Sequence, residues 1–302
     1  MSFSGDVRRE ICSYINDKDK KFACLYGMLL FGRRLSREKI SFRTESRTSA
    51  ETFVMLFKSV MHRDINFKEK RRRDGSVLYS FDIYDSDILD KVFWTYHFSE
   101  NERSIDCETM STGSLGVFTA GVFLACGSVN DPNKEYHLEF ISPCESLADE
   151  LVSLLKDIGV NAKTAVRRNQ YVVYVKGSES IEDTLTFIGA PQCTLEIMNV
   201  KIYKDVRNKA NRITNCDSAN IDKVINAAMK QTEDIKLIIS TNGIESLNSE
   251  LREVALMRLE NVGMSLKDIG ENLSEPISRS GVNHRFKKIA KIADDIRKGV
   301  TN

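Results

Sequence analysis

Two short apolar segments with glycine in the same place constrain the fold of this chain most. They read CLYGMLLFGRR over residues 24–34 and FTAGVFLACGS over residues 118–128. A glycine inside a helix costs about 1 kcal/mol relative to alanine, so a retained glycine usually marks a close approach of another backbone. Matching Gly27 to Gly121 sets an offset of 94 residues, 121 − 27. We therefore expect two helices that pack against each other through these glycines.

The same offset relates further features of the chain. It pairs apolar positions expected on strands and helix faces: Phe42 with Tyr136, Phe57 with Leu151, Val60 with Leu154, Tyr79 with Val173, and Phe81 with Val175. It also pairs Asp74-Gly75 with Arg168-Asn169, and Asp-Gly between two alternating segments is typical of a two-residue hairpin turn. Short apolar matches can arise by chance, but several features at one offset favour duplication.

The duplication predicts an α+β fold. Each half is expected to form helix, strand, helix, strand, strand and helix, which is an αβαββα unit. The duplicated, pseudo-symmetric domain is predicted over residues 1–192, with halves at about 1–100 and 111–192. The glycine-containing helices then meet at the symmetry axis, where small residues let backbones approach.

Composition excludes several classes of protein. The formal net charge is only +1, so any attraction to a polyanion has to be local. The seven cysteines are odd in number and form no CxxC pair, which is typical of reduced cytoplasmic thiols rather than of disulfides or a zinc site. The segment MSFSGDVRRE lacks the apolar core of a signal peptide, and no apolar run approaches the ~20 residues that span a bilayer. We expect a cytoplasmic protein with no membrane partner and no cofactor.

The repeat resembles the LAGLIDADG homing-endonuclease family, in which two glycine-containing helices form the interface between similar halves. In that family an acidic residue at the penultimate motif position binds the divalent metal. This position falls on Gly32 and Cys126, and neither side chain carries an oxygen. Because Mg²⁺ requires oxygen ligands, the resemblance implies a retained scaffold with no metal site, no catalytic residues and no nuclease activity.

Basic side chains gather on the predicted strands of the first half. The segment KEKRRRDG places Lys68, Lys70, Arg71, Arg72 and Arg73 before the first hairpin turn. The same half adds Arg33, Arg34, Arg37, Lys39 and Arg43, whereas the second hairpin offers only Lys163, Arg167, Arg168 and Lys176. Clustered cations can neutralise DNA phosphates without reading sequence. Charge can also protect an exposed edge strand against aggregation, so two interpretations stand.

Residues 193–245 are predicted to form a helical linker. Its segment NVKIYKDVRNKANR holds five basic residues and one acid, which makes Arg207 and Arg212 candidate contacts to the DNA backbone. The same side chains can equally form the solvated side of a connecting helix. Asp217 or Ser218 is a plausible N-cap, so we expect the linker to divide into two helices.

Residues 246–302 are predicted to form a helix-turn-helix domain, with the motif at about 265–298. Ser265, followed by Asp268, is the expected N-cap of the second helix. Pro276 ends that helix, and Ser278 or Ser280 is expected to cap the third. A tight turn between the second and third of three helices is typical of a DNA-binding helix-turn-helix.

The third helix divides into two faces. Its apolar face contains Val282, Phe286, Ile289, Ala293 and Ile296. Between residues 278 and 291 there are five Lys or Arg residues and no acid. Lysines suit phosphates, and Asn283 and His284 near the helix start can reach base edges. The predicted DNA contacts are Arg279, Ser280, Asn283, His284, Arg285, Lys287, Lys288 and Lys291. A cationic amphipathic helix is often only a solvated face, but the preceding helix and turn favour DNA binding.

Nearly the whole chain resembles the WhiA family of bacterial sporulation and cell-division regulators. The resemblance rests on SFSGDVRRE, FTAGVFLACGSVNDPNKEYHLEF, NRITNCDSAN, LREVALMRL, SLKDIGENL and SRSGVNHRFKKI. It implies a degenerate LAGLIDADG domain joined to a helix-turn-helix, with roles in transcription, cell division and chromosome segregation. The implied partners are double-stranded DNA and proteins of the transcription or division machinery, and the implied location is the nucleoid.

Two other classes of function compete with a sequence-specific regulator. An active LAGLIDADG-type homing endonuclease is disfavoured by Gly32 and Cys126. A scaffold that acts through protein contacts is compatible with the nearly neutral net charge.

Overall fold

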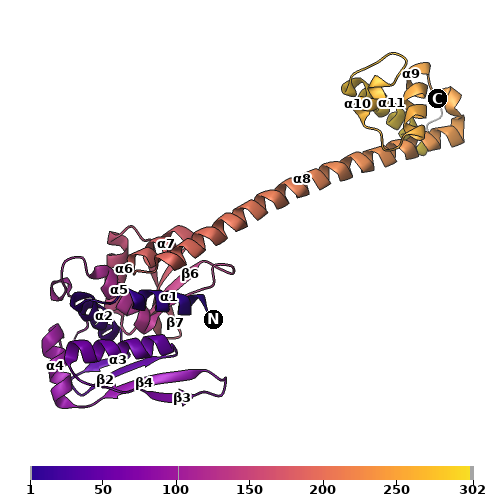
Figure 1. Ribbon diagram of the computed structural model, residues 1–302. Coiled ribbons are helices and arrows are strands. Elements are labelled where there is room, and N and C mark those ends of the chain that lie inside the picture. Colours follow the sequence, from indigo (N-terminus) through magenta and orange to yellow (C-terminus); the bar gives the residue numbers. More distant parts are fainter. Residues whose placement is uncertain (1, 101, 300–302) are drawn as a thin grey trace. The chain divides into compact units, whose positions relative to one another are not determined.

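A computed structural model describes residues 2–100 and 102–299 of the chain (Figure 1). The chain forms two compact units, Met1–Asp205 and Val206–Asn302. The first unit combines helices with two antiparallel sheets, and the second is helical, so the predicted α+β class is confirmed. No helix in the described part of the chain is long and apolar enough to cross a membrane.

The first unit consists of two halves with the same sheet topology. The first half contains α1 (Phe3–Ser13), α2 (Lys18–Leu30), β1 (Arg34–Ser36), β2 (Lys39–Thr44), α3 (Arg47–Met61), β3 (Lys68–Arg71), β4 (Val77–Ile83) and α4 (Ser86–Tyr96). The second half, which follows a short 3-10 turn at Cys107–Thr109, contains α5 (Leu115–Cys126), β5 (Gly127–Val129), β6 (His137–Ser142), α6 (Glu145–Asp157), β7 (Ala162–Arg167), β8 (Gln170–Lys176) and α7 (Ser178–Phe187). The strand orders, β1-β2-β4-β3 and β5-β6-β8-β7, are equivalent, so the predicted duplication is confirmed.

The two glycine-containing helices, α2 and α5, lie side by side at the centre of the first unit (Figure 1). A Cβ atom on Gly27 would overlap the carbonyl oxygen of Phe118, and one on Gly121 would overlap that of Cys24. Residues 23–30 of α2 and 118–124 of α5 are buried and belong to the core of the first unit. The predicted contact through these glycines is confirmed.

The predicted unit lacked one strand per half. β1 and β5 are three residues each, and each forms an outer strand beside β2 or β6. Runs this short carry too little alternation to be recognised in a sequence. Each half after α1 is therefore helix, two strands, helix, two strands and helix.

The single offset of 94 residues was wrong beyond the central helices. Phe42 lies opposite Phe81 in the first sheet, and Phe140, not Tyr136, takes the equivalent place opposite Val173 in the second. The loops of the two halves differ in length, so the number of residues between equivalent positions changes along the chain. Loops tolerate insertions better than strands do.

One of the two hairpin turns differs from the prediction. Asp74 and Gly75 lie in a five-residue loop, residues 72–76, rather than in a two-residue turn. The two-residue turn is the one in the second half. There Arg168 and Asn169 adopt φ angles of 49° and 60°, as a type I′ turn requires.

The second unit begins within a long helix, α8 (Pro191–Asn242), which is continuous over 52 residues. The predicted division at Asp217 or Ser218 was wrong. No glycine or proline lies between residues 192 and 242, and an interior Asp or Ser costs only about 0.5 kcal/mol, less than nucleating a new helix. The predicted domain boundaries near 192 and 245 stay predictions.

Three further helices complete the second unit: α9 (Ser249–Glu260), α10 (Leu266–Glu271) and α11 (Arg279–Arg297), preceded by a 3-10 turn at Ile244–Ser246. Their core includes Ile235 and Ile238 from the last turns of α8. The end of α8 thus packs against α9, α10 and α11 and shares their hydrophobic core.

Candidate nucleic-acid interface

Helix α11 is held in one orientation by a buried face. The buried side chains recur every three or four residues: Val282, Phe286, Ile289 and Ala293. The hydroxyl of Ser278 caps the helix by accepting a hydrogen bond from the Gly281 amide at 3.2 Å. The predicted apolar face is confirmed, and of the two candidate caps Ser278 is the one used.

The turn before α11 is built around one glycine. Ser265 caps α10 as predicted, accepting from the Asp268 amide at 3.2 Å. After α10 the chain folds back so that the Ile277 amide donates to the Gly270 carbonyl at 3.0 Å. A Cβ atom on Gly270 would overlap the Ile277 carbonyl oxygen. Only glycine at this position lets the turn close, which sets where α11 begins.

The polar residues predicted to contact DNA project from the other face of α11. Seven of them are exposed: Arg279, Ser280, Asn283, His284, Lys287, Lys288 and Lys291. Among the described residues, the lysines of this set and Arg279 have no acidic partner, so their charge is available to an anion. Contact of these side chains with DNA stays a prediction.

Arg285 differs from its neighbours on α11. Its side chain is only 15% exposed, and its Nη2 lies 3.6 Å from Glu250 of α9. A guanidinium packed at the edge of the core is less accessible to a phosphate than the exposed lysines are. Of the predicted contacts, Arg285 is therefore the weakest candidate.

Arg258 of α9 joins several elements of the second unit, a role that the sequence did not indicate. It is 2% exposed, and its Nη1 donates to the carbonyl oxygens of Val262 at 2.9 Å and Met264 at 2.6 Å. Its Nε donates to Gln231 of α8 at 3.0 Å, and its guanidinium lies 5.4 Å from the ring centroid of Phe286. Burial lowers the pKa of this guanidinium. One side chain therefore ties α8, the loop after α9, and α11 together.

The two positions where homing endonucleases carry metal ligands lie at the ends of the central helices. Gly32 follows α2, and Cys126 is the last residue of α5. Burial raises the pKa of the Cys126 thiol to about 12, and its Sγ lies 3.3 Å from the Val122 carbonyl oxygen. Among the residues that the structure describes, no group of three His, Cys, Asp or Glu side chains is placed to hold a metal ion.

Arginines instead occupy the ends of these helices. Arg103 Nη1 donates to the carbonyl oxygens of Gly32 at 2.7 Å and Leu30 at 3.3 Å. Arg8 Nη2 donates to the carbonyl oxygen of Gly127, just after α5, at 2.6 Å. A cation is favourable there because the free carbonyls at a helix C-terminus carry partial negative charge. Burial lowers the pKa of both arginines, although each keeps its carbonyl contacts.

The sheet register sorts the basic residues of β3 by face. Lys68 lies opposite Ser80, and Ser80 lies opposite Arg43, so both cations are on the face that α3 does not cover. Side chains alternate along a strand, so Lys70 shares that face and Arg71 lies on the other. All four residues of β3 are exposed, and β3 is an edge strand. Protection of the edge by charge therefore remains a sufficient explanation for some of them.

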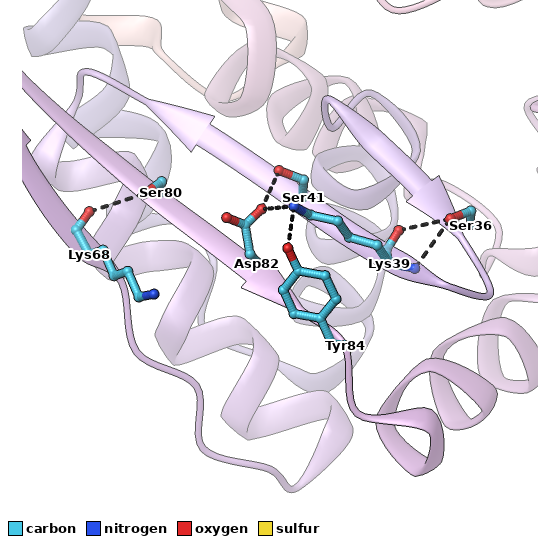
Figure 2. A network of polar contacts seen from close by, with 7 residues as sticks. All are labelled: Ser36, Lys39, Ser41, Lys68, Ser80, Asp82 and Tyr84. Atoms are coloured by element: carbon cyan, nitrogen blue, oxygen red, sulfur yellow. Dashed lines mark hydrogen bonds and ion pairs between the residues drawn. The ribbon is translucent and has the colours of Figure 1, made fainter.

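Acidic neighbours neutralise other cations of this half. Figure 2 shows the Lys39 Nζ pointing to Asp82 at 2.8 Å and to the Tyr84 hydroxyl at 2.7 Å, while the Ser41 hydroxyl also donates to Asp82. This contact with Lys39 holds the pKa of Asp82 below its usual value. Further pairs join Arg34 to Glu38, Arg37 to Asp90 and Glu100, and Arg72 to Glu45. Of the four cations Lys70, Arg71, Arg72 and Arg73, only Arg72 is paired within the described chain.

Other predicted cations are also solvent-exposed. Arg33 and Arg43 line a hollow of about 510 Å³ beside Cys126. Arg207 and Arg212 are exposed on α8 and have no ion pair among the described residues. These four side chains are available to an anion, but nothing in their geometry reads a base.

Known proteins resemble the chain along its whole length. The family model described as "WhiA C-terminal HTH domain" matches residues 210–293, and "WhiA LAGLIDADG-like domain" matches residues 115–207. A "Probable cell division protein WhiA" from Clostridium acetobutylicum is 37% identical over 314 residues, which cover 99% of each chain. The relative of the same name from Ruminiclostridium cellulolyticum is 35% identical over 309 residues, again covering 99% of each.

A solved structure has the same fold. It is the crystal structure of full-length DUF199/WhiA from Thermotoga maritima, with a TM-score of 0.59 and 23% identity, covering 97% of this chain and 98% of that one. Its low identity supports the fold alone, whereas the curated relatives and the two domain matches support common descent. The chain belongs to the WhiA family.

Proposed function

We propose that this protein is a sequence-specific DNA-binding regulator of transcription and cell division that binds chromosomal sites within the nucleoid. The observation that carries the proposal is the exposed face of α11. Four cations with no acidic partner among the described residues surround Asn283 and His284 there. The helix-turn-helix domain match supports DNA binding, and the curated relatives named as cell division proteins support a role in division, to which we add chromosome segregation.

The side chains of α11 divide into two roles. Arg279, Lys287, Lys288 and Lys291 contact phosphates, and Asn283 and His284 reach base edges in the major groove. A carboxamide can form two hydrogen bonds with adenine, whereas an ammonium group neutralises a phosphate of any sequence. Specificity therefore depends on Asn283 and His284, and affinity depends on the cations.

The repeat domain adds contacts to the DNA backbone. Lys70 and Arg43 are exposed on the sheet face that α3 leaves open and have no acidic partner among the described residues. Arg73 in the hairpin loop, with Arg207 and Arg212 on α8, extends the set. Such contacts raise affinity for every sequence alike and make binding more sensitive to salt.

The protein binds DNA without cutting it. Cleavage by a divalent metal needs carboxylate ligands that hold the ion, which in turn activates water and stabilises charge. Gly32 and Cys126 supply neither ligand, and Arg103 and Arg8 place positive charge beside both positions. Purified protein is expected to leave plasmid and chromosomal DNA intact in Mg²⁺ or Mn²⁺, and cleavage lost on substitution of Cys126 would refute this.

Chromatin immunoprecipitation followed by competition binding tests the regulator. The first step identifies enriched sites, and the second measures binding of the full chain to such a site against random duplex. Replacing Asn283 with alanine should cost about 1–3 kcal/mol for the preferred site and leave random duplex unchanged. Replacing Lys287 should weaken both and lower the slope of log affinity against log salt by about 0.9. Lys230, exposed on α8 outside this face, provides the matched control. Equal losses from Asn283→Ala and Lys287→Ala on both duplexes would remove the assigned roles.

An exposed tryptophan favours a second function, as a scaffold for proteins of the transcription or division machinery. Trp94 of α4 is 78% exposed, and tryptophan is enriched at the centres of protein interfaces. Replacing Trp94 with alanine should then abolish recovery of partners from native cells and leave DNA affinity unchanged. Unchanged partner recovery would remove this second function.

A further inference from the structure

The second unit contains a cavity that the proposed DNA interface does not use. It has a volume of about 490 Å³ and lies between α8, the loop after α9, and the first residues of α10 and α11. This volume is within the range of sites for small molecules in proteins, about 300–1,000 Å³. The cavity is therefore large enough for a small organic molecule and is larger than a single inorganic ion requires.

The lining of the cavity is strongly cationic. It includes Lys223, Arg258, Lys267 and Arg279 and no Asp or Glu. Lys267 lies 3.7 Å from the exposed Glu271, a surface pair that neutralises little of its charge. Lys223 and Arg279 have no acidic partner among the described residues. The charge of the cavity selects an anion.

Arg258, which lines this cavity, has one nitrogen that no acceptor in the described part of the chain engages. Arg258 is 2% exposed, its Nε and Nη1 are occupied by Gln231 and three backbone carbonyls, and no acceptor for its Nη2 occurs among the described residues. An anionic oxygen in the cavity would accept from this nitrogen, on a guanidinium that Gln231 and the backbone carbonyls already hold in place.

The remaining walls are apolar. Val224, Ala227, Ala228, Met264 and Leu266 form them. Val224 is 54% exposed, so an apolar group laid on it would be removed from water. A free phosphate ion would leave these walls uncovered.

We infer that this cavity binds a small amphipathic anion, with a phosphate or carboxylate at Arg258 Nη2 and the rim cations, and an apolar body against Val224 and Met264. Arg279 is the first residue of α11 and also lines the cavity. A bound anion would therefore engage one of the cations proposed for DNA, and the ligand would weaken DNA binding. The site itself does not depend on the proposed DNA-binding function, so it is tested without DNA.

Phenyl phosphate and benzoate are suitable probes, because each joins an anionic group to an apolar ring. Their binding to the full chain can be measured by displacement of the fluorescent amphipathic anion 8-anilinonaphthalene-1-sulfonate. Both should displace the dye at millimolar concentrations, as their size predicts. Inorganic phosphate has the anionic group without the ring, and benzyl alcohol has the ring without the anionic group. Each should bind at least about tenfold more weakly than phenyl phosphate does. Equal binding of inorganic phosphate, or displacement by random duplex DNA but not by phenyl phosphate, would overturn the assignment.

Variants at the rim locate the site. Lys223→Glu should weaken phenyl phosphate about fivefold to tenfold by reversing one charge at the rim, and Ala227→Phe should exclude it by filling the cavity. Lys209→Glu makes the same charge change on α8 about 21 Å along the helix from Lys223 and should have no effect. Both changed residues are exposed on a helix, so the fold is retained and circular dichroism checks it. Undiminished binding in the Lys223 and Ala227 variants would refute the site.

Discussion

Replacement of Gly121 by alanine tests the central contact of the repeat domain. An added Cβ would lie 2.9 Å from the Cys24 carbonyl carbon and 3.1 Å from its Cα, and it would overlap the carbonyl oxygen. All three atoms belong to the backbone of α2, so no side chain can rotate away. The helices have to separate by about 1 Å to restore ordinary contact distances, which loosens the packing of both buried faces.

The expected loss of stability follows from two opposing terms. Overpacking at a rigid contact costs about 3 kcal/mol, and alanine returns about 1 kcal/mol of helix propensity, so the first unit should lose about 2 kcal/mol. Opening of α2 and α5 then becomes about thirtyfold more frequent, since each 1.4 kcal/mol is a factor of about ten. Hydrogen exchange of the amides in these two helices measures this change directly, without assuming that the two units unfold together.

Gly5 provides the matched control. It is also a helical glycine of the first unit, but a Cβ there would meet only the side chains of Ser2 and Arg9. Gly5→Ala should leave exchange in α2 and α5 unchanged. Gly27→Ala should behave like Gly121→Ala, and the double variant should lose less than the sum because the helices have already separated. Wild-type protection in Gly121→Ala would refute the reasoning that backbone contact requires glycine at this position.

Three further results are expected. Lys70→Glu should weaken binding to all duplexes more than Arg71→Glu does, because the two side chains lie on opposite faces of β3; equal losses in a salt titration would place no special role on the open face. Iodoacetamide at neutral pH should label the exposed Cys216 and spare the half-buried Cys126, whose pKa of about 12 keeps the thiol protonated; mass spectrometry reads both sites. Arg258→Met should destabilise the second unit by about 2–4 kcal/mol, because it leaves three carbonyl oxygens without their hydrogen-bond donor. Hydrogen exchange of the amides in the loop after α9 should then become faster, while the amides of α2 stay protected.

Features that depend on neighbours in the sequence were predictable. The two faces of α11 follow from apolar residues three and four apart, and its start follows to within two residues from the candidate caps Ser278 and Ser280, of which Ser278 is used. The glycine contact was predictable for a different reason: two matched segments each retained a costly glycine, and a close approach explains both. Local pattern and internal repetition thus determined the fold class and the exposed face of α11.

Features that depend on long-range or backbone partners were not predictable. The acceptors of Arg258 Nη1 are carbonyl oxygens, which every residue has, so no sequence signal marks them. Arg285 and Glu250 meet only after α9 and α11 have packed. Asp217 and Ser218 illustrate the opposite error: both residue types cap helices well, which predicts a cap, but no glycine or proline near them stops the helix.

Gly32 and Cys126 differ from metal-ligand positions in more than the absence of a carboxylate. Arg8 lies close enough to Cys126 to influence its titration, and it holds the carbonyl that follows α5. A carboxylate introduced by Cys126→Asp would therefore meet a guanidinium at short range, and this ion pair competes directly with coordination of Mg²⁺. Arg103 has the same relation to the end of α2 through Gly32. Because a guanidinium lies beside each position, acids introduced there would form internal ion pairs first, and the same positive charge that disfavours a metal favours the approach of a phosphate.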